Sequence, residues 1–152
     1  MSTFTLVHVA ISLIGIVAGL VVVYGFVAGL RLKGWNWLFL VMTILTSVTG
    51  FFFPWKGVTP GIILGIVSLV VLALALVALQ KAWTKTYIIT SVLAEFFNVF
   101  VLINQSFQKI PALHALAPTG KEPVILACAV VALVLFAVLA WLAIRKKAFV
   151  LV

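Results

Sequence analysis

Residues 86–109, TYIITSVLAEFFNVFVLINQSFQK, are apolar enough to cross a membrane and yet carry several polar side chains. At about 100° per residue, most of these polar side chains fall on one face of a helix. The residues of that face are Ser91, Glu95, Asn98, Leu102, Gln105 and Lys109. Asn104 lies on the opposite side. Because polar groups on a membrane helix face the interior of a bundle, this segment predicts an all-α transmembrane bundle with a polar interior.

The composition also indicates a membrane protein. Hydrophobic residues make up 66% of the chain and charged residues only 8%, whereas a soluble domain is about half apolar and a quarter charged. The net charge of +8 comes from Lys and Arg clustered between apolar segments. Such clusters are typical of membrane orientation and headgroup contact. We therefore expect the lipid bilayer, and no nucleic acid, as a partner.

Five segments approach the roughly 20 apolar residues that a spanning helix needs. They are residues 6–30, 37–53, 61–79, 86–107 and 124–144, within a single transmembrane domain of residues 1–152. The second is the shortest, so four spans with a re-entrant segment are an alternative. Three prolines in residues 108–123 exclude a long helix there.

The basic residues predict an orientation. With five spans, one side of the membrane receives Arg31, Lys33, Lys81, Lys85, Arg145, Lys146 and Lys147. The other side receives Lys56, Lys109 and Lys121. Because loops rich in Lys and Arg stay in the cytoplasm, we expect the N-terminus outside and the C-terminus in the cytoplasm.

Small residues predict where helices pack closely. Glycines at a spacing of four allow two helix backbones to approach each other in lipid. Such glycines are Gly15, Gly19, Gly25 and Gly29 in the first segment and Gly61 and Gly65 in the third. The alternative is that glycine is simply frequent in membrane helices. A hydroxyl-bearing face in the second segment carries Thr43, Thr46 and Ser47.

Glu95 lies near the middle of its segment, about 14 Å from the cytoplasmic end at 1.5 Å per residue. An ionised carboxylate at that depth costs a few kcal/mol or more, and no Lys or Arg lies at the same level. One interpretation is a proton-titrating or ligand-binding group, with Asn98 and Gln105 continuing a polar path toward the outer face. The other is a neutral Glu95 that hydrogen-bonds a Ser or Thr of a neighbouring helix and joins the two helices.

The chain has few residues that could form a metal site or a catalytic site. His8, His114 and Glu122 are predicted on the outer side, where they could bind a divalent metal, or the imidazoles could bind haem. Their spacing is not diagnostic, and interfacial histidines without a ligand are the alternative. The chain has no Asp, a single cysteine (Cys128), and no phosphate loop, GxSxG, HExxH or CxxC motif. We expect no enzyme and no particular cofactor.

Three stretches carry a family resemblance: TSVTGFFFP (46–54), NVFVLINQSFQKIPALHALAPT (98–119) and GKEP (120–123). With them the chain resembles a widespread family of small multi-spanning bacterial inner-membrane proteins. The resemblance covers nearly the whole chain and is most specific at FQKIPALHALAPT (107–119). It implies a bacterial inner membrane and one helical domain, and it implies no activity. Within the best-matching stretch, it draws attention to Asn98, Gln105, Lys109 and the loop 111–118.

Two classes of function follow as hypotheses. The first is a non-enzymatic scaffold, an accessory subunit or a binder of a lipid or quinone-like ligand, assembled as a homo-oligomer or within a larger membrane complex. The alternative is an oligomeric proton-coupled carrier that uses Glu95, although no inverted repeat is evident. Haem or metal binding through His8 and His114 is a third hypothesis.

Overall fold

The computed structural model describes residues 2–54 and 57–146, and these form six helices. The helices are α1 (Thr3–Ala28), α2 (Lys33–Gly50), α3 (Pro60–Gln80), α4 (Thr84–Lys109), α5 (Pro111–His114) and α6 (Pro123–Arg145). The described ranges contain no strand. Each long helix begins and ends within a few residues of a predicted segment, and only the four-residue α5 forms in the proline-rich loop. The all-α prediction is confirmed.

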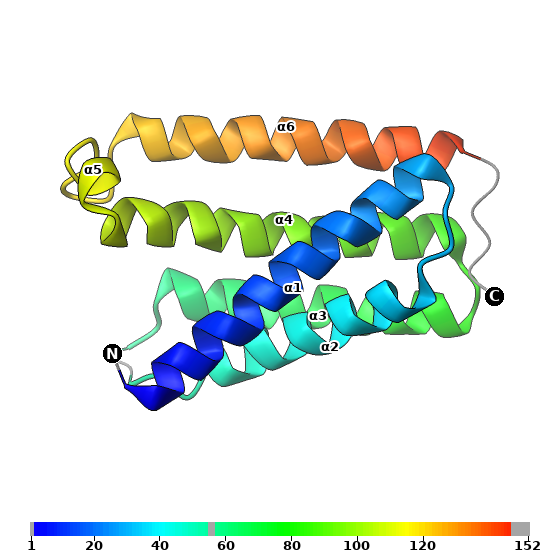
Figure 1. The fold of residues 1–152 in the computed structure, drawn as a ribbon, viewed down its shortest axis with the longest axis horizontal. Coiled ribbons are helices and arrows are strands. Elements are labelled where there is room, and N and C mark those ends of the chain that lie inside the picture. The colour runs from blue at the N-terminus through cyan, green and yellow to red at the C-terminus, as the bar shows by residue number, and fades with distance from the viewer. Residues whose placement is uncertain (1, 55–56, 147–152) are drawn as a thin grey trace.

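The long helices run back and forth along one direction, and α1 crosses the others obliquely (Figure 1). α1 begins and α6 ends at opposite ends of the bundle. Four helices, α1, α3, α4 and α6, are long and apolar enough to cross a membrane, which indicates a membrane protein. α2 is a continuous helix of 18 residues packed along α1. It is less apolar because its first turn contains Lys33 and Asn36.

Local sequence explains the helix boundaries. Ser2 caps α1 by accepting a hydrogen bond from the Thr5 backbone N–H at 3.2 Å. Prolines stand in the first turn of α3, α5 and α6, where the missing N–H breaks no helical hydrogen bond. Gly29 ends α1 in the left-handed conformation, with φ of 73°.

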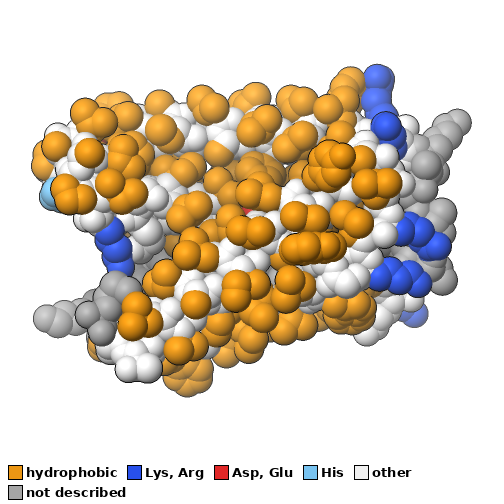
Figure 2. All heavy atoms as spheres, viewed as in Figure 1, with side chains coloured by type: hydrophobic (Ala, Val, Ile, Leu, Met, Phe, Trp, Pro, Cys, Tyr) orange, Lys and Arg blue, Asp and Glu red, His pale blue; other side chains and the backbone are white. Residues whose placement is uncertain are grey.

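The distribution of apolar side chains is that of a protein in lipid. Large apolar side chains cover the visible face of the bundle (Figure 2), where lipid rather than water is their solvent. The interior is closely packed in one half, around Phe26, Phe39 and Tyr87. The Tyr87 hydroxyl donates to Asn36 Oδ1 at 3.0 Å, so this buried phenol has a partner.

Charge is concentrated at one end, which we name the basic end. It carries Arg31, Lys33, Lys81, Lys85, Arg145 and Lys146, at the right in Figure 2. Exposed tryptophans lie close to these residues in sequence: Trp35, Trp37, Trp83 and Trp141. The Arg145 guanidinium lies 4.0 Å from the centre of the Trp141 ring. The opposite end, which we name the far end, carries Lys109 and Lys121. Lys56 and Lys147 lie outside the described residues.

The glycine prediction is right for some positions and wrong for others. Gly15 and Gly19 are buried in α1 against α2, and Gly19 also contacts Glu95 of α4. Gly65 lies against the Phe51 ring. These three are sites of close approach, as expected.

The remaining glycines lie in other surroundings. Gly25 is buried, and a methyl group there would lie 2.7 Å from Cδ1 of Leu32, in the connection to α2, so the chain approaches it closely as well. Gly29 serves to end the helix, and its backbone N–H bonds to the carbonyls of Gly25 and Phe26. Gly61 is exposed and has only Thr59 near it. Spacing alone did not separate glycines that pack from those that end a helix.

Candidate functional site: a pocket at the far end

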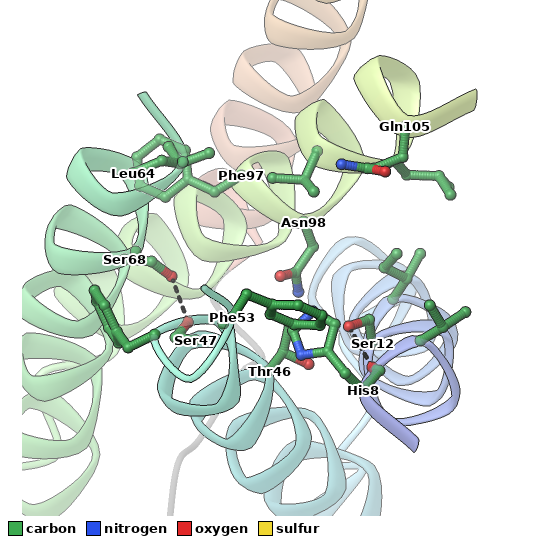
Figure 3. Close-up of a pocket in the computed structure, with 18 of the residues that line it drawn as sticks. His8, Ser12, Thr46, Ser47, Phe53, Leu64, Ser68, Phe97, Asn98 and Gln105 are labelled. Atoms are coloured by element: carbon green, nitrogen blue, oxygen red, sulfur yellow. Dashed lines mark hydrogen bonds between the residues drawn. The ribbon is translucent and has the colours of Figure 1, made fainter. Parts of the chain in front are cut away.

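A pocket of about 530 Å³ lies between α1, α2, α3 and α4 (Figure 3). Its lining includes Thr5 in the first turn of α1 and Lys109 at the end of α4, so its mouth is at the far end. Its base is lined by Ile16 and Asn98. Asn98 is eleven residues before Lys109, or about 16 Å deeper at 1.5 Å per residue.

The walls are mainly apolar, with polar groups at selected positions. Phe97, Val101 and Leu102 of α4 and Leu13 of α1 are among the apolar lining residues. The polar side chains toward the base are Ser12, Thr46, Ser47, Ser68 and Asn98. His8, Gln105 and Lys109 lie nearer the mouth. This is the composition of a small-molecule site, with a few oriented polar groups in an apolar cleft.

The hydrogen bonds of His8 fix its tautomer. Its Nδ1 lies 2.7 Å from Thr49 Oγ1, and that hydroxyl donates its single hydrogen to the Leu45 carbonyl at 2.6 Å. Nδ1 must therefore carry the hydrogen and donate it to Thr49. In the neutral ring, Nε2 is then an acceptor. The ring also packs edge-on against Phe53, with 5.0 Å between centroids.

Asn98 connects the pocket to the packed interior. Its Nδ2 donates to Thr43 Oγ1 at 3.1 Å and to Glu95 Oε2 at 3.2 Å. Both amide hydrogens are thus used within the protein, between α2 and α4. No hydrogen bond from the described residues reaches Asn98 Oδ1. This oxygen is left as an acceptor on a pocket-lining side chain.

Glu95 lies behind the base of the pocket rather than in its wall. Its side chain is fully buried between Gly19 of α1 and its own helix. Oε2 accepts from Asn98, while Oε1 has no partner among the described residues. A link between α2 and α4 runs from Asn98 to Thr43, whereas one of the two interpretations of Glu95 had its carboxyl bond a hydroxyl of a neighbouring helix directly. The reason is geometric, since Gly19 brings the α1 backbone against the carboxyl.

The polar face of α4 is directed inward, as the sequence predicts. Ser91 and Glu95 are fully buried, and Asn98, Leu102, Gln105 and Lys109 line the pocket. Asn104, on the other side, donates to the Phe100 carbonyl of its own helix at 2.9 Å.

Hydroxyls from three other helices meet this face, which the sequence alone does not show. Those groups are Ser12 of α1, Thr46 and Ser47 of α2 and Ser68 of α3. Their small-residue faces were visible in the sequence, but which faces meet depends on the rotation of each helix.

The predicted metal ligands do not come together. The described residues contain no group of three or more His, Cys, Asp and Glu side chains that could hold a metal. His8 lies in the pocket, and His114 ends α5. Glu122 accepts from the Thr119 backbone N–H at 2.9 Å, from the Thr119 hydroxyl at 2.8 Å and from the Lys121 N–H at 3.0 Å. These bonds, led by the one from the Thr119 N–H, lower the pKa of Glu122.

Comparison of the chain with protein families, with curated proteins and with solved structures gives no match. Its function therefore has to be inferred from the pocket itself.

Proposed function

We propose that this protein binds a small lipophilic molecule, such as a lipid or a quinone-like compound, in the pocket at the far end. The observation that carries the proposal is the pocket. Its volume of about 530 Å³ lies within the range of about 300–1,000 Å³ that is typical of ligand sites. Its walls are apolar and its polar groups are few, so a molecule dissolved in the bilayer suits it better than a water-soluble one.

Binding rather than catalysis is the role that the lining residues support. Among the described lining residues, His8 is the only imidazole, and its Nδ1 is bonded to the Thr49 hydroxyl rather than to a carboxylate. These described residues include no Cys, Asp or Glu. A non-enzymatic binder, alone or within a larger membrane complex, is therefore our proposal.

We further propose five membrane spans, with the far end outside and the basic end in the cytoplasm of a bacterial inner membrane. α2 counts as a span because it is a continuous helix of 18 residues that packs along α1 (Figure 1). The clustering of Lys, Arg and Trp at the basic end supports the orientation, and the family resemblance supports the membrane.

Cysteine labelling tests this topology. Cys128 is first replaced by alanine, and single cysteines are then placed at Ser2 and at Lys146. In intact cells, a membrane-impermeant maleimide should label the Ser2→Cys variant and not the Lys146→Cys variant, which should react only after lysis. Labelling of both variants in intact cells would indicate an even number of spans.

Native mass spectrometry of gently extracted protein tests the proposed function. We expect a retained lipophilic molecule, and the same spectrum reports the number of subunits. Gly61→Phe should remove that molecule, because Gly61 lines the pocket and a side chain there meets little else. Gly34→Phe is the matched control, since Gly34 lies in α2 outside the pocket lining, with no atom within 4 Å of its Cβ position. Retention of the molecule by Gly61→Phe would place the site elsewhere.

A proton-coupled carrier is a second candidate, favoured by the fully buried Glu95 whose Oε1 has no partner among the described residues. Asn98 would connect this carboxyl to a ligand in the pocket. Glu95→Gln removes the titratable group and keeps its shape. If binding or transport keeps the same pH dependence in that variant, the carrier hypothesis fails while the binding proposal stands.

A further inference from the structure

Hydrogen-bond acceptors predominate at the base of the pocket. Asn98 presents Oδ1 because both of its N–H groups are already used. Ser12 gives its hydroxyl hydrogen to the His8 carbonyl at 2.7 Å, so its oxygen is left as an acceptor. Nearer the mouth, His8 presents Nε2, because Nδ1 donates to Thr49. Figure 3 shows Ser12 and His8 of α1 and Asn98 of α4 around the same pocket.

Thr46 carries a hydroxyl without a partner beside the same space. Its Oγ1 is buried and makes no hydrogen bond to any described residue, although threonines in helices commonly bond the carbonyl one turn back. Thr46 lies beside His8 and below Asn98 in Figure 3. Because this oxygen is enclosed by protein atoms, it offers no hydrogen bond to a ligand in the pocket.

The base carries no charged side chain. Lys109 is the only Lys, Arg, Asp or Glu among the described residues of the lining, and it lies at the mouth. Glu95 is fully buried behind Asn98 and is absent from the lining. An anionic headgroup at the base would therefore face acceptors without a cation. A cationic headgroup would be desolvated without a contacting carboxylate.

We propose that the ligand is an uncharged lipophilic alcohol or phenol that binds with its hydroxyl group at the base. The hydroxyl hydrogen is donated to one of the two acceptors at the base, Asn98 Oδ1 or Ser12 Oγ. The hydrocarbon part lies along Phe97, Val101 and Leu102 toward the mouth. This inference rests on the proposed function, because it specifies the chemical class of the ligand for the same pocket.

Two isomeric probes of identical composition test it: 1-dodecanol, which has a hydrogen-bond donor, and methyl undecyl ether, which has none. Each is titrated into delipidated full-length protein, and the bound fraction is read by native mass spectrometry. We expect the alcohol to bind about five- to tenfold more tightly, because a ratio of that size corresponds to the free energy of one hydrogen bond. Ser12→Ala, which removes an acceptor from the pocket lining, should weaken the binding of dodecanol several-fold.

Ser91→Ala is the matched control for Ser12→Ala. Ser91 is fully buried in α4 and does not line the pocket, so dodecanol binding should not change. Equal affinity for the two probes would overturn this inference and leave the proposed function intact. So would an equal loss of dodecanol binding in the Ser12 and Ser91 variants. If neither probe binds, the proposed function itself fails.

Discussion

Gly19→Ala tests the closest contact in the bundle. A methyl group on Gly19 would overlap the Glu95 carboxyl and would lie 2.9 Å from Cδ2 of the Phe39 ring. Both neighbours are fully buried, so neither can move aside freely. Overpacking of this kind costs about 1–3 kcal/mol, and the better helix propensity of alanine returns up to about 1 kcal/mol. We therefore expect a net loss of about 1–2 kcal/mol in the free energy of unfolding.

Gly15→Ala is the control, one helical turn away on the same face. Its new methyl group would lie 3.4 Å from Met42 Cβ and 3.5 Å from Thr43 Oγ1, which is close to ordinary van der Waals contact. This variant should be neutral or slightly more stable. The assay is reversible unfolding by SDS in mixed micelles, followed by circular dichroism.

A double-mutant cycle with Glu95→Ala identifies the contact that is responsible. If the carboxyl causes the overlap, Gly19→Ala should cost about 1 kcal/mol less in the Glu95→Ala background. The same cost in both backgrounds would refute the packing of Gly19 against Glu95. Wild-type stability of the Gly19→Ala variant would refute it as well.

Three further outcomes are expected. Glu95→Gln keeps an oxygen for the neighbouring amide, so its free energy of unfolding should stay within about 1 kcal/mol of the wild type in the same SDS titration. Gly29→Ala should lose about 1 kcal/mol in that assay, because φ at Gly29 is 73° and alanine is strained there. Glu122 has a lowered pKa in the folded protein, so the hydrogen bonds that its carboxylate accepts in the turn are fully formed at neutral pH. They are lost as the pH falls from the ordinary pKa of glutamate toward the lower pKa of Glu122 in the folded protein. Hydrogen exchange at the Thr119 and Lys121 amides should then show reduced protection at acidic pH, and Glu122→Gln should show the same at neutral pH.

Much of the fold could be predicted because lipid imposes simple rules. Apolar segments of spanning length, separated by proline, glycine and basic residues, gave the long helices to within a few residues. The inward direction of the polar face of α4 followed from the cost of placing Glu95 and Asn98 in lipid. Both predictions depend only on residues within one helix.

The pocket could not be predicted because it depends on how helices are rotated against one another. The hydroxyls of Thr46 and Ser68 were visible as parts of small-residue faces, yet nothing in the sequence places them opposite Asn98. The glycine error has a similar origin. Gly29 has the spacing of a packing residue, and only the basic residues just after it, Arg31 and Lys33, indicate that the helix ends there.

The position of the pocket follows from where the helices pack closely. In α1, every buried residue lies at Gly15 or later, and none lies nearer the far end. In α2 and α3, most of the buried residues likewise lie in the half toward the basic end, and the others, Thr43 and Ser68, lie close to the middle of their helices. Gly19 is where α1 touches both α2 and α4, and α1 crosses the other helices obliquely (Figure 1). Beyond that crossing, toward the far end, α1 separates from α4, and the space between them is the pocket. A methyl group at Gly19 should therefore change the pocket as well as the stability, so Gly19→Ala is expected to alter dodecanol binding, whereas Gly15→Ala is not.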